Sequence, residues 1–402
     1  MFGFFTDDGF IYGEGGHIWN ELSPKGCRPI DIGYNVEETL ALLTEYAMSS
    51  GDEKMLEKCL ESARCHAVLL LPDGGWNNSF GTRMDKWTYW GSRTSDGCQP
   101  TYIMLSSLDS SLGFVADTNL AALERTTFDG LLYGGEDLHR HGEPPCVHHA
   151  FTHAEGLVKA REWAESHGKT DCEYHKKKGT VYIPEADTYI VNENGWRVTV
   201  TGNDSGEKEY CAPSGGAVSL LYHGKTGPLL VSSMTRFIRY EIMNTQRHMK
   251  CDDLPFTVRL QKGGEPVCYS NILDKGAVIK QVSGNTFEAN GKICGVKGEN
   301  PPDGAVSFKS RYVFETDRAV FTYEHSGENI DLIFPAVIKN DEPVTVKDGK
   351  TVMIKNGTEI KIDFEGAVPE ITRFFNHVPG FEGCELKITN VPQRITVTVE
   401  LI

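Results

Sequence analysis

The sequence predicts an α+β protein in which a helical N-terminal domain precedes a large antiparallel β-sandwich. Apolar residues recur at the spacing of amphipathic helices between Asn35 and Ser166. From about Gly179 onward the pattern changes to short β-rich runs separated by Gly, Asn, Asp and Pro turns, without helical segments between them. We therefore predict a helical domain over residues 1–170, a linker over 171–178 and a sandwich domain over 179–402.

The helical domain contains five periodic segments, which cover residues 35–50, 53–71, 97–108, 118–133 and 144–166. Asn35, the pair Asp117 and Thr118, and the pair Pro144 and Pro145 stand where helix starts are expected. Most of the connections are short, which predicts antiparallel helical hairpins. The exception is the long connection that contains WNNSFGTRMDKWTYWGSRTSDG, from Trp76 to Gly97.

The second half contains runs such as WRVTVTG, AVSLLYHG, AVFTYEH and ITVTVELI. Turns such as ENGW, KNGT and KDGK separate them, and these favour tight hairpins. Successive strands joined in this way predict antiparallel sheets.

Composition and charge exclude several classes of protein. The chain has 402 residues, of which 39% are hydrophobic and 24% charged, as in folded globular proteins. Its net charge of -16 disfavours nucleic acid and anionic membranes as partners. No apolar run approaches the roughly 20 residues of a membrane helix, and MFGFFTDDGF lacks the features of a signal peptide. The eleven Cys are scattered without a CxxC pair, which predicts free thiols.

The long connection combines aromatic, cationic and amide side chains. Aromatic faces stack on sugar rings, and guanidinium groups bind carboxylate or sulfate, so this mixture suits an acidic sugar chain. Two alternatives remain open, namely stacking of single-stranded nucleic acid and a loop held down by its own buried Trp. The residues concerned are Trp76, Asn77, Asn78, Arg83, Lys86, Trp87, Tyr89, Trp90 and Arg93.

Five of the thirteen His lie within fifteen residues, at 139, 141, 148, 149 and 153. His149 and His153 are one helical turn apart, which is also the spacing of a two-His metal site, but the HExxH arrangement is absent. Such residues can also cap a helix or fill a core. We favour anion contact or proton transfer. No cofactor is predicted to be required, and a structural divalent metal in the β half has no support in the spacing.

Two further groups leave alternatives open. Tyr240, Glu241, Asn244 and Gln246 follow an apolar strand and line either a binding face or a solvated one. Acidic residues near the aromatic stretch keep a glycoside hydrolase open, and they are Asp85, Asp96, Glu136 and Asp137. The sequence has no GxSxG elbow, no Walker loop and no dinucleotide fingerprint after a strand.

Four phrases carry a family resemblance: GCRPIDIGYNVEETL, NNSFGTRMDKWTYWGSRTSDG, CVHHAFTHAEGL and GPLLVSSMTRFIRYEIMNTQ. Together with the domain order, they resemble the bacterial heparinase II/III-like polysaccharide lyases. The resemblance implies an incomplete (α/α) toroid of helical hairpins joined to the antiparallel β-sandwich, in a chain that begins inside the toroid. It also implies cleavage of a uronic-acid polysaccharide, such as a glycosaminoglycan, by β-elimination.

The same resemblance implies roles for individual residues. Tyr89 is expected to transfer the proton beside Arg93, while Asn78 and His149 contact the substrate carboxylate. Arg83 and His148 are further catalytic candidates. The expected substrate-binding residues are Trp76, Asn77, Lys86, Trp87, Trp90, His141, His153, Tyr240, Glu241, Asn244 and Gln246.

The predicted partner is an acidic polysaccharide or oligosaccharide, without nucleic acid or membrane insertion, and homo-oligomerisation is left open. A glycoside hydrolase with a carboxylate pair and a non-catalytic glycan-binding protein are the alternatives. We expect a periplasmic or secreted protein if the chain is a fragment of a longer family member, and a cytoplasmic one otherwise.

Overall fold

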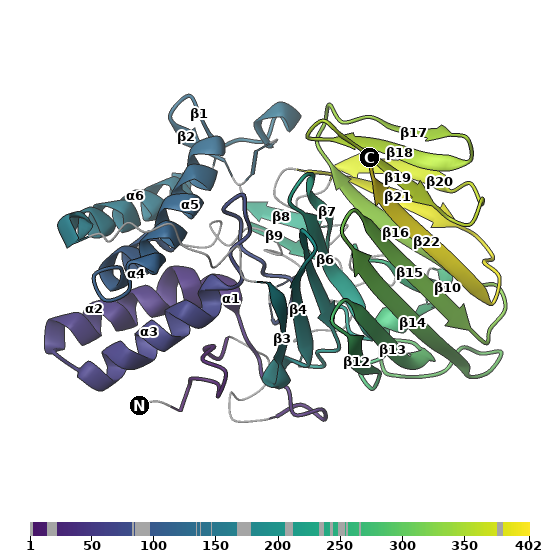
Figure 1. Cartoon of the computed structure of the whole chain (residues 1–402), viewed down its shortest axis with the longest axis horizontal. Helices are drawn as coiled ribbons and strands as arrows, with labels where there is room; N and C mark the ends of the chain where they lie inside the picture. The colour runs from purple at the N-terminus through teal and green to yellow at the C-terminus, as the bar shows by residue number, and fades with distance from the viewer. Residues whose placement is uncertain are drawn as a thin grey trace.

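The computed structural model of the protein has helices at one end and β-sheets at the other (Figure 1). The residues that it describes are 3–13, 22–82, 84, 97–133, 135–136, 138–145, 147–166, 178–205, 212–232, 237–241, 244–247, 254, 256–264, 267–375 and 381–402. At 148–149, 237–241, 244–247 and 375 the description covers the backbone only.

The helical end contains α1 (Ile32–Tyr34), the π-helical turn η1 (Asn35–Thr39), α2 (Leu40–Ser50), α3 (Glu53–Ala67), α4 (Gln99–Leu105), α5 (Ser111–Arg125), the 3-10 turn η2 (Leu138–His141), α6 (Val147–Glu162) and η3 (Ala164–Ser166). A small hairpin of β1 (Thr127–Phe128) and β2 (Leu131–Leu132) follows α5. None of the described helices is long and apolar enough to cross a membrane.

Local sequence explains why α2 and α3 form a hairpin. Gly51 ends α2 with a φ of 71°, which residues other than glycine rarely adopt. The Asp52 side chain then accepts a hydrogen bond from the Met55 backbone N–H at 3.0 Å and caps α3. A single glycine and a single capping residue are therefore enough to reverse the chain.

Two details of the predicted helices were wrong. The segment 118–133 is not one helix, because Asp129 and Gly130 both have positive φ and turn the chain into the β1–β2 hairpin. Its helix instead begins at Ser111, so Asp117 and Thr118 lie inside α5 and are not its cap. Asn35 is not an N-cap either, since Asp31 is the N-cap of α1 and Asn35 is its C-cap and the first residue of the π-helical turn.

The first five-stranded sheet lies between the helices and the remaining sheets (Figure 1). Its strands run in the order β3 (Gly179–Ile183), β4 (Thr188–Glu193), β5 (Trp196–Thr201), β6 (Ala217–His223) and β7 (Gly227–Val231). A 3-10 turn η5 (Pro184–Ala186) joins β3 to β4, and a separate hairpin pairs β8 (Phe237–Glu241) with β9 (Asn244–Arg247).

The other two sheets are also antiparallel. The eight-stranded sheet has the order β12 (Val278–Ser283), β13 (Thr286–Ile293), β14 (Val306–Glu315), β15 (Arg318–His325), β22 (Arg394–Leu401), β19 (Thr358–Asp363), β18 (Lys350–Lys355) and β17 (Val344–Lys347). The second five-stranded sheet has the order β11 (Val267–Ser270), β10 (Arg259–Gly264), β16 (Asp331–Ile338), β21 (Glu382–Ile388) and β20 (Glu370–Phe375), with the 3-10 turn η7 (Asn271–Leu273) after β11.

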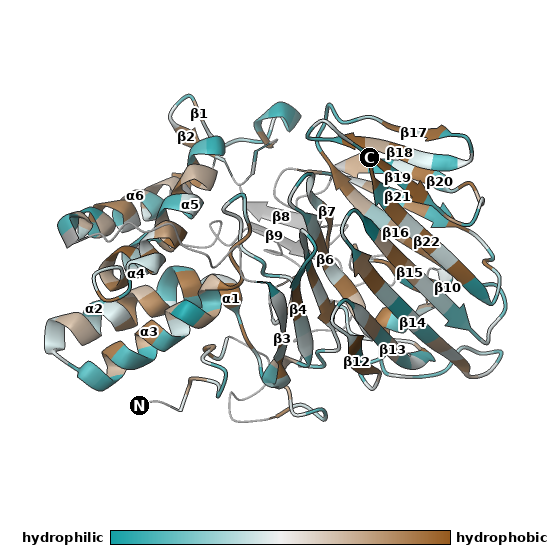
Figure 2. Cartoon of the chain, viewed as in Figure 1, coloured by the Kyte–Doolittle hydropathy of each residue, from teal (hydrophilic) through white to brown (hydrophobic). Residues whose placement is uncertain are grey.

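These sheets form the predicted sandwich. Hydrophilic and hydrophobic residues alternate along β14 and β15 (Figure 2), and along β14 buried and exposed side chains alternate in the same way. The buried faces meet in one apolar core that includes Val198, Phe287, Phe321 and Phe334. The α+β class and the antiparallel sandwich are therefore confirmed, whereas the toroid stays a prediction.

Two smaller apolar clusters join the helical end to the sheets. One combines Phe80 of the helical end with Ile183 and Ile190 of the first sheet. The other combines Leu123 of α5 with Leu220 of β6. All the described cysteines are free thiols.

The segment from Leu22 to Asp31 runs from the helical end onto the sheets. Lys25 Nζ donates to the carbonyl oxygens of Gly202 at 2.7 Å and Ala277 at 2.9 Å, and it pairs with Asp187. Arg28 pairs with Glu185 at 3.2 Å. This segment therefore binds two sheets at once, and we refer to residues 22–31 as the strap.

Candidate functional site

Most of the predicted catalytic loop lies outside the described residues. This applies to Arg83, Lys86, Trp87, Tyr89, Trp90 and Arg93, and to the acidic residues Asp85, Asp96 and Asp137. The described residues on either side show how the ends of the loop are held, so the site is built from those ends.

The entry to the loop is fixed against the core. Gly81 has a φ of 92°, and a Cβ atom there would lie only 2.1 Å from the Ile30 carbonyl oxygen. The next residue, Thr82, donates its backbone N–H to the same oxygen at 2.8 Å. The chain therefore leaves the core at one defined point.

Trp76 and Asn77 lie buried in this fold, and their predicted role as substrate contacts stays a prediction. Trp76 is only 1% exposed, and its ring lies 5.8 Å from that of Tyr102. Asn77 Nδ2 donates to Thr199 Oγ1 of β5 at 2.9 Å, while its Oδ1 accepts from the Ser79 backbone N–H at 3.2 Å. The amide of Asn77 therefore joins the helical end to the first sheet.

Asn78 follows directly and is 1% exposed. Its backbone N–H donates to the Trp76 carbonyl oxygen at 3.1 Å, so its position depends on the two anchored residues before it. Its predicted contact with a substrate carboxylate stays a prediction.

The exit of the loop passes over a buried polar cluster that sequence reasoning did not find in full. A Cβ atom at Gly97 would lie 2.6 Å from Gln99 Oε1 and 2.8 Å from His153 Nδ1. Gln99 Nε2 donates to Asn119 Oδ1 at 2.9 Å, and Asn119 Nδ2 donates to the Gly74 carbonyl oxygen at 2.8 Å. His153 is among the predicted residues and is 3% exposed, beneath the loop exit.

The other predicted residues are placed only in part. His148 and His149 lie in α6, with His149 one turn before His153, and their side chains are outside the described residues. Tyr240 and Glu241 lie on β8, and Asn244 and Gln246 on β9, where Glu241 is paired with Asn244. Their side chains are likewise not described, so the predicted second wall of the cleft stays a prediction.

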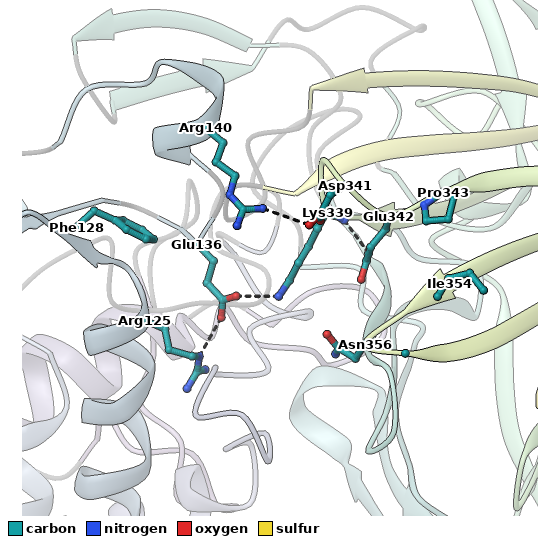
Figure 3. A pocket seen from close by; sticks show the side chains of 11 residues that line it. Arg125, Phe128, Glu136, Arg140, Lys339, Asp341, Glu342, Pro343, Ile354 and Asn356 are labelled. Carbon is teal, nitrogen blue, oxygen red and sulfur yellow. Dashed lines mark hydrogen bonds and ion pairs between the residues drawn. The ribbon is translucent and has the colours of Figure 1, made fainter.

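A pocket of about 500 Å³ lies between the helical end and the sheets (Figure 3). The helical end contributes Arg125, Phe128, Glu136 and Arg140, and the sheets contribute Lys339, Asp341, Glu342, Pro343, Ile354, Asn356 and Gly357. An adjoining pocket of about 380 Å³ shares Arg125, Glu136, Lys339 and Asn356. Because the two pockets share these residues, we refer to them together as the interdomain pocket.

Glu136 connects the two sides of the interdomain pocket. Its carboxylate accepts from Arg125 Nε at 3.0 Å and from Lys339 Nζ at 3.0 Å, and Figure 3 shows both cations directed at it. Burial alone would raise the pKa of Glu136, but the Lys339 ammonium and the Arg125 hydrogen bond bring it below its ordinary value. Because a glycosidase proton donor needs a raised pKa, Glu136 is poorly suited to that role.

A buried lysine supports the wall that carries Lys339. Lys355 is 1% exposed, donates to the Val337 carbonyl oxygen at 2.9 Å and pairs with Glu342 Oε2 at 2.9 Å. Glu342 Oε2 also accepts from the Lys339 backbone N–H at 2.7 Å. This arrangement fixes the turn after β16 and so directs Lys339 across the domain boundary.

His141 also lies at this boundary. Its Nε2 is 4.0 Å from Glu382 Oε1 of β21, with both side chains largely buried. The sequence prediction placed His141 at the substrate, while the structure places it against an acidic residue of the sheets. Arg125, Lys339 and Asn356 were not predicted, because a lone charged or amide side chain near the end of a helix or strand is common on protein surfaces.

Comparison with known proteins gives a family match over almost the whole chain. Residues 2–178 match the ulvan lyase N-terminal domain, and residues 180–402 match the ulvan lyase C-terminal domain. A broad-specificity ulvan lyase from Formosa agariphila is 33% identical over 409 residues, which cover 96% of this chain and 63% of that enzyme. The chain therefore spans less than two thirds of the length of this curated relative.

Two solved structures were also found as distant neighbours. Chondroitin AC lyase from Streptomyces coelicolor A3 is 11% identical with a TM-score of 0.45, covering 98% of this chain and 56% of that one. A galactose mutarotase-like protein from Lactobacillus casei is 8% identical with a TM-score of 0.29, covering 56% of this chain and all of that one (100%). TM-scores this low do not support an inference about the fold or the function of this chain.

Proposed function

Because the chain belongs to the ulvan lyase family, we propose that it cleaves an acidic polysaccharide of the ulvan type by β-elimination. The observation that carries this proposal is the match of both halves of the chain to the two domains of that family. The 33% identity with a broad-specificity ulvan lyase supports the same substrate class. We retain a relationship to the heparinase II/III-like lyases as the finer form of the proposal.

Elimination from a uronic acid unit requires three tasks. The carboxylate at C5 must be neutralised so that the adjacent proton becomes acidic, a base must remove that proton, and an acid must protonate the leaving oxygen at C4. We propose Tyr89 for proton transfer, with Asn78 and His149 at the carboxylate. An ordinary Tyr has a pKa near 10, so its cationic neighbours in sequence, Arg83 and Arg93, are proposed to lower it. His148 is retained as a further catalytic candidate.

The described surroundings of the loop support this assignment without testing it. The Gly81 and Gly97 positions fix the entry and the exit, and Asn78 and His153 lie next to those two points. A loop held at both ends can present its side chains in one arrangement, which catalysis requires. Lys86, Trp87 and Trp90 are proposed as sugar contacts of the same loop.

Two alternatives predict other outcomes. A glycoside hydrolase would need a carboxylate pair. The lowered pKa of Glu136 makes it a poor proton donor, so the remaining candidates for the pair are Asp85, Asp96 and Asp137. A glycan-binding protein would bind the polymer without turnover. We propose a periplasmic or secreted location if the chain is a fragment of a longer family member, and a cytoplasmic one otherwise. Cell fractionation tests this location.

Ultraviolet absorbance during incubation with ulvan and other uronic-acid polysaccharides distinguishes these functions. Elimination creates a conjugated double bond and raises the absorbance, whereas hydrolysis produces reducing ends without that signal. We expect Tyr89→Phe and His149→Ala each to lower the rate at least about hundredfold. Tyr46→Phe is the matched control, because Tyr46 is an exposed tyrosine of α2.

Each other result has a defined meaning. New reducing ends at constant absorbance would identify a hydrolase, and binding without either signal would identify a glycan-binding protein. Near-wild-type rates in both variants would move the site away from Tyr89 and His149. Circular dichroism of each variant verifies that folding is retained.

A further inference from the structure

The exposed side of α6 is largely apolar, unlike that of α3. Val147 is 78% exposed, Phe151 67% and Val158 62%, although phenylalanine and valine are among the residue types most often buried. In α3 every exposed residue is charged, and these residues are Glu53, Lys54, Glu57, Lys58, Glu61 and Arg64. Single exposed apolar residues are normal on a protein surface, but a continuous group of them marks an interaction surface.

The three residues lie on one line along α6, together with the exposed Ala154. Because successive residues of a helix are about 100° apart, the four side chains fall within an arc of about 60°. Their spacing of four, three and four residues is the pattern that forms the seam between paired helices. We refer to Val147, Phe151, Ala154 and Val158 as the α6 stripe.

The α6 stripe faces away from the rest of the helical end. His153 is two residues from Phe151, and so about 200° around the helix, and it is 3% exposed. Ala160, on the same buried side, belongs to the apolar cluster that contains Ile103 of α4. In Figure 1, α4 lies between α6 and the hairpin of α2 and α3. The stripe is therefore on the outer side of the helix, where another molecule can reach it.

A second copy of α6 fits this stripe when the two helices run antiparallel. One register places Val147 of each copy opposite Val158 of the other, and it also places each Phe151 opposite an Ala154. A large ring then meets a small side chain, as the layers between packed helices require. A parallel pair would place the two Phe151 rings against each other and leave a gap between the two Ala154 side chains. The stripe is therefore complementary to itself in the antiparallel arrangement.

The charges favour an apolar contact between copies over an ionic one. None of the four stripe residues is charged, and Arg161, at the next position of the pattern, ends the stripe. Because each copy has a net charge of -16, two copies repel one another. Added salt screens this repulsion and leaves the apolar contact intact, so association should strengthen as the salt concentration rises.

We propose that two copies of this chain form a symmetric dimer through antiparallel contact of their α6 stripes. About three turns of one helix bury less surface than the roughly 800 Å² per partner of a standard interface, so the Kd should be on the order of 10 μM. The dimer is independent of the proposed function, because the stripe contains none of the residues proposed for elimination.

Sedimentation velocity of the whole chain, at concentrations below and above the expected Kd, tests the dimer. Phe151→Glu and Val158→Glu each place a carboxylate in the contact, so each should raise the Kd at least about tenfold. Glutamate has a higher helix propensity than phenylalanine or valine, so α6 should be retained, which circular dichroism verifies.

Val278→Glu is the matched control for Val158→Glu. Val278 lies on β12 and is 62% exposed, as Val158 is, so the two variants make the same change at equally exposed positions. Val278 is outside the stripe, and the Kd of its variant should stay within about twofold of wild type.

Disulfide formation tests the orientation of the two helices. A mixture of Val147→Cys and Val158→Cys chains should form a linked dimer, because these positions face each other in the antiparallel register. Val147→Cys alone should not, since the two residues 147 lie about 16 Å apart along the helices and a disulfide needs Cα atoms within about 7 Å. Wild type under the same oxidation is the control for native thiols. Linkage of Val147→Cys with itself would overturn the antiparallel arrangement.

Three results of sedimentation would overturn the proposal. A wild type that stays monomeric at about ten times the expected Kd, at low and at high salt, shows that the stripe does not bind a second copy. An equal Kd for Val158→Glu and Val278→Glu places the interface on another surface. A dimer that dissociates as salt rises is held by ion pairs and not by the stripe.

Discussion

The two ends of the molecule differ in the extent of their apolar cores, because the sheets share one large cluster while the apolar residues of the helical end form smaller ones. The sheets enclose one apolar core with rings such as Phe314, Phe321 and Phe334. The helical end places polar and ionisable groups among its apolar residues, including buried His66, Gln99 and Asn119. Buried polar groups cost stability unless each is hydrogen-bonded. Buried polar groups occur at both ends, as Lys355 and His66 show, so the comparison indicates that the extent of the apolar core makes the sheets the main source of stability.

The largest expected effect lies in the apolar core. Phe321→Ala should lower the free energy of unfolding by about 3–5 kcal/mol, because it leaves a cavity between the rings of Tyr312, Phe314 and Phe334. Urea unfolding followed by fluorescence measures this loss. Val320→Ala on the same strand is the control and should cost below about 1 kcal/mol, since that position is partly exposed. A small loss in Phe321→Ala would show that the sheets are not the main source of stability.

The second effect tests the buried ionisable groups of the helical end. Burial lowers the pKa of His66 to about 4, while its ring contacts the Ser62 carbonyl oxygen at 2.8 Å. As the pH falls below the ordinary value near 6.5, the unfolded chain binds a proton that the folded state does not. Stability is therefore lost progressively between about pH 6.5 and pH 4, by up to about 3 kcal/mol from this group.

Comparison of wild type with His66→Leu isolates that contribution. Other buried histidines, His223 and His325, also have lowered pKa values and remain in both proteins. Urea unfolding at pH 7, 5.5 and 4.5 should therefore show a smaller acid loss in His66→Leu. If the stability of wild type and of His66→Leu falls in parallel with pH, the pKa of His66 is not lowered by burial, and water reaches its ring in the folded state.

The third effect concerns the polar contact between the two ends. Asn77→Ala should cost about 1–3 kcal/mol, because it leaves the buried Thr199 hydroxyl and Ser79 N–H without the amide. A double-mutant cycle with Thr199→Val measures the coupling directly. The exposed Asn290 of β13 is the control, and its change to Ala should be nearly neutral. If the free-energy changes of Asn77→Ala and Thr199→Val add without a coupling term, the hydrogen bond between these two side chains does not stabilise the contact between the two ends.

The smallest effect is expected at the interdomain pocket. Glu136→Gln should cost below about 1 kcal/mol, because its pairs with Arg125 and Lys339 are partly exposed. Since the pKa of Glu136 is lowered, its contribution is present above the ordinary value and is lost as the pH falls through the folded value. Thermal unfolding at low and high salt should show a difference only at low salt. Glu61→Gln, at an exposed pair of α3, is the neutral control.

The sheets were easier to predict than the helical end, and the reason is physical. Alternating residues such as those of β14 bury one face, so their pattern determines both the strand and its register. Helical periodicity over 118–133 gave the wrong structure, because Asp129 and Gly130 adopt positive φ and override it. The sequence also contains no sign that Trp76 is covered by Tyr102, since this burial depends on tertiary packing.

The site was predictable only within single segments. The proximity of Gly97, Gln99 and His153 follows in part from helical geometry and in part from packing of α4 against α6. The interdomain pocket could not be anticipated, because Glu136 and Lys339 are 203 residues apart and each is unremarkable in its own segment. Contacts of this kind depend on how the domains dock.

The strap has a consequence for how the chain is made. Lys25 leaves the ribosome before one of its acceptors, the Ala277 carbonyl, which follows 252 residues later. At translation rates of about 5–20 residues per second, roughly 10–50 s separate the two. During that interval Lys25 can reach Asp187 and Gly202 but not the Ala277 carbonyl. The contact between Lys25 and Ala277 is therefore among the last to form as the sheets assemble.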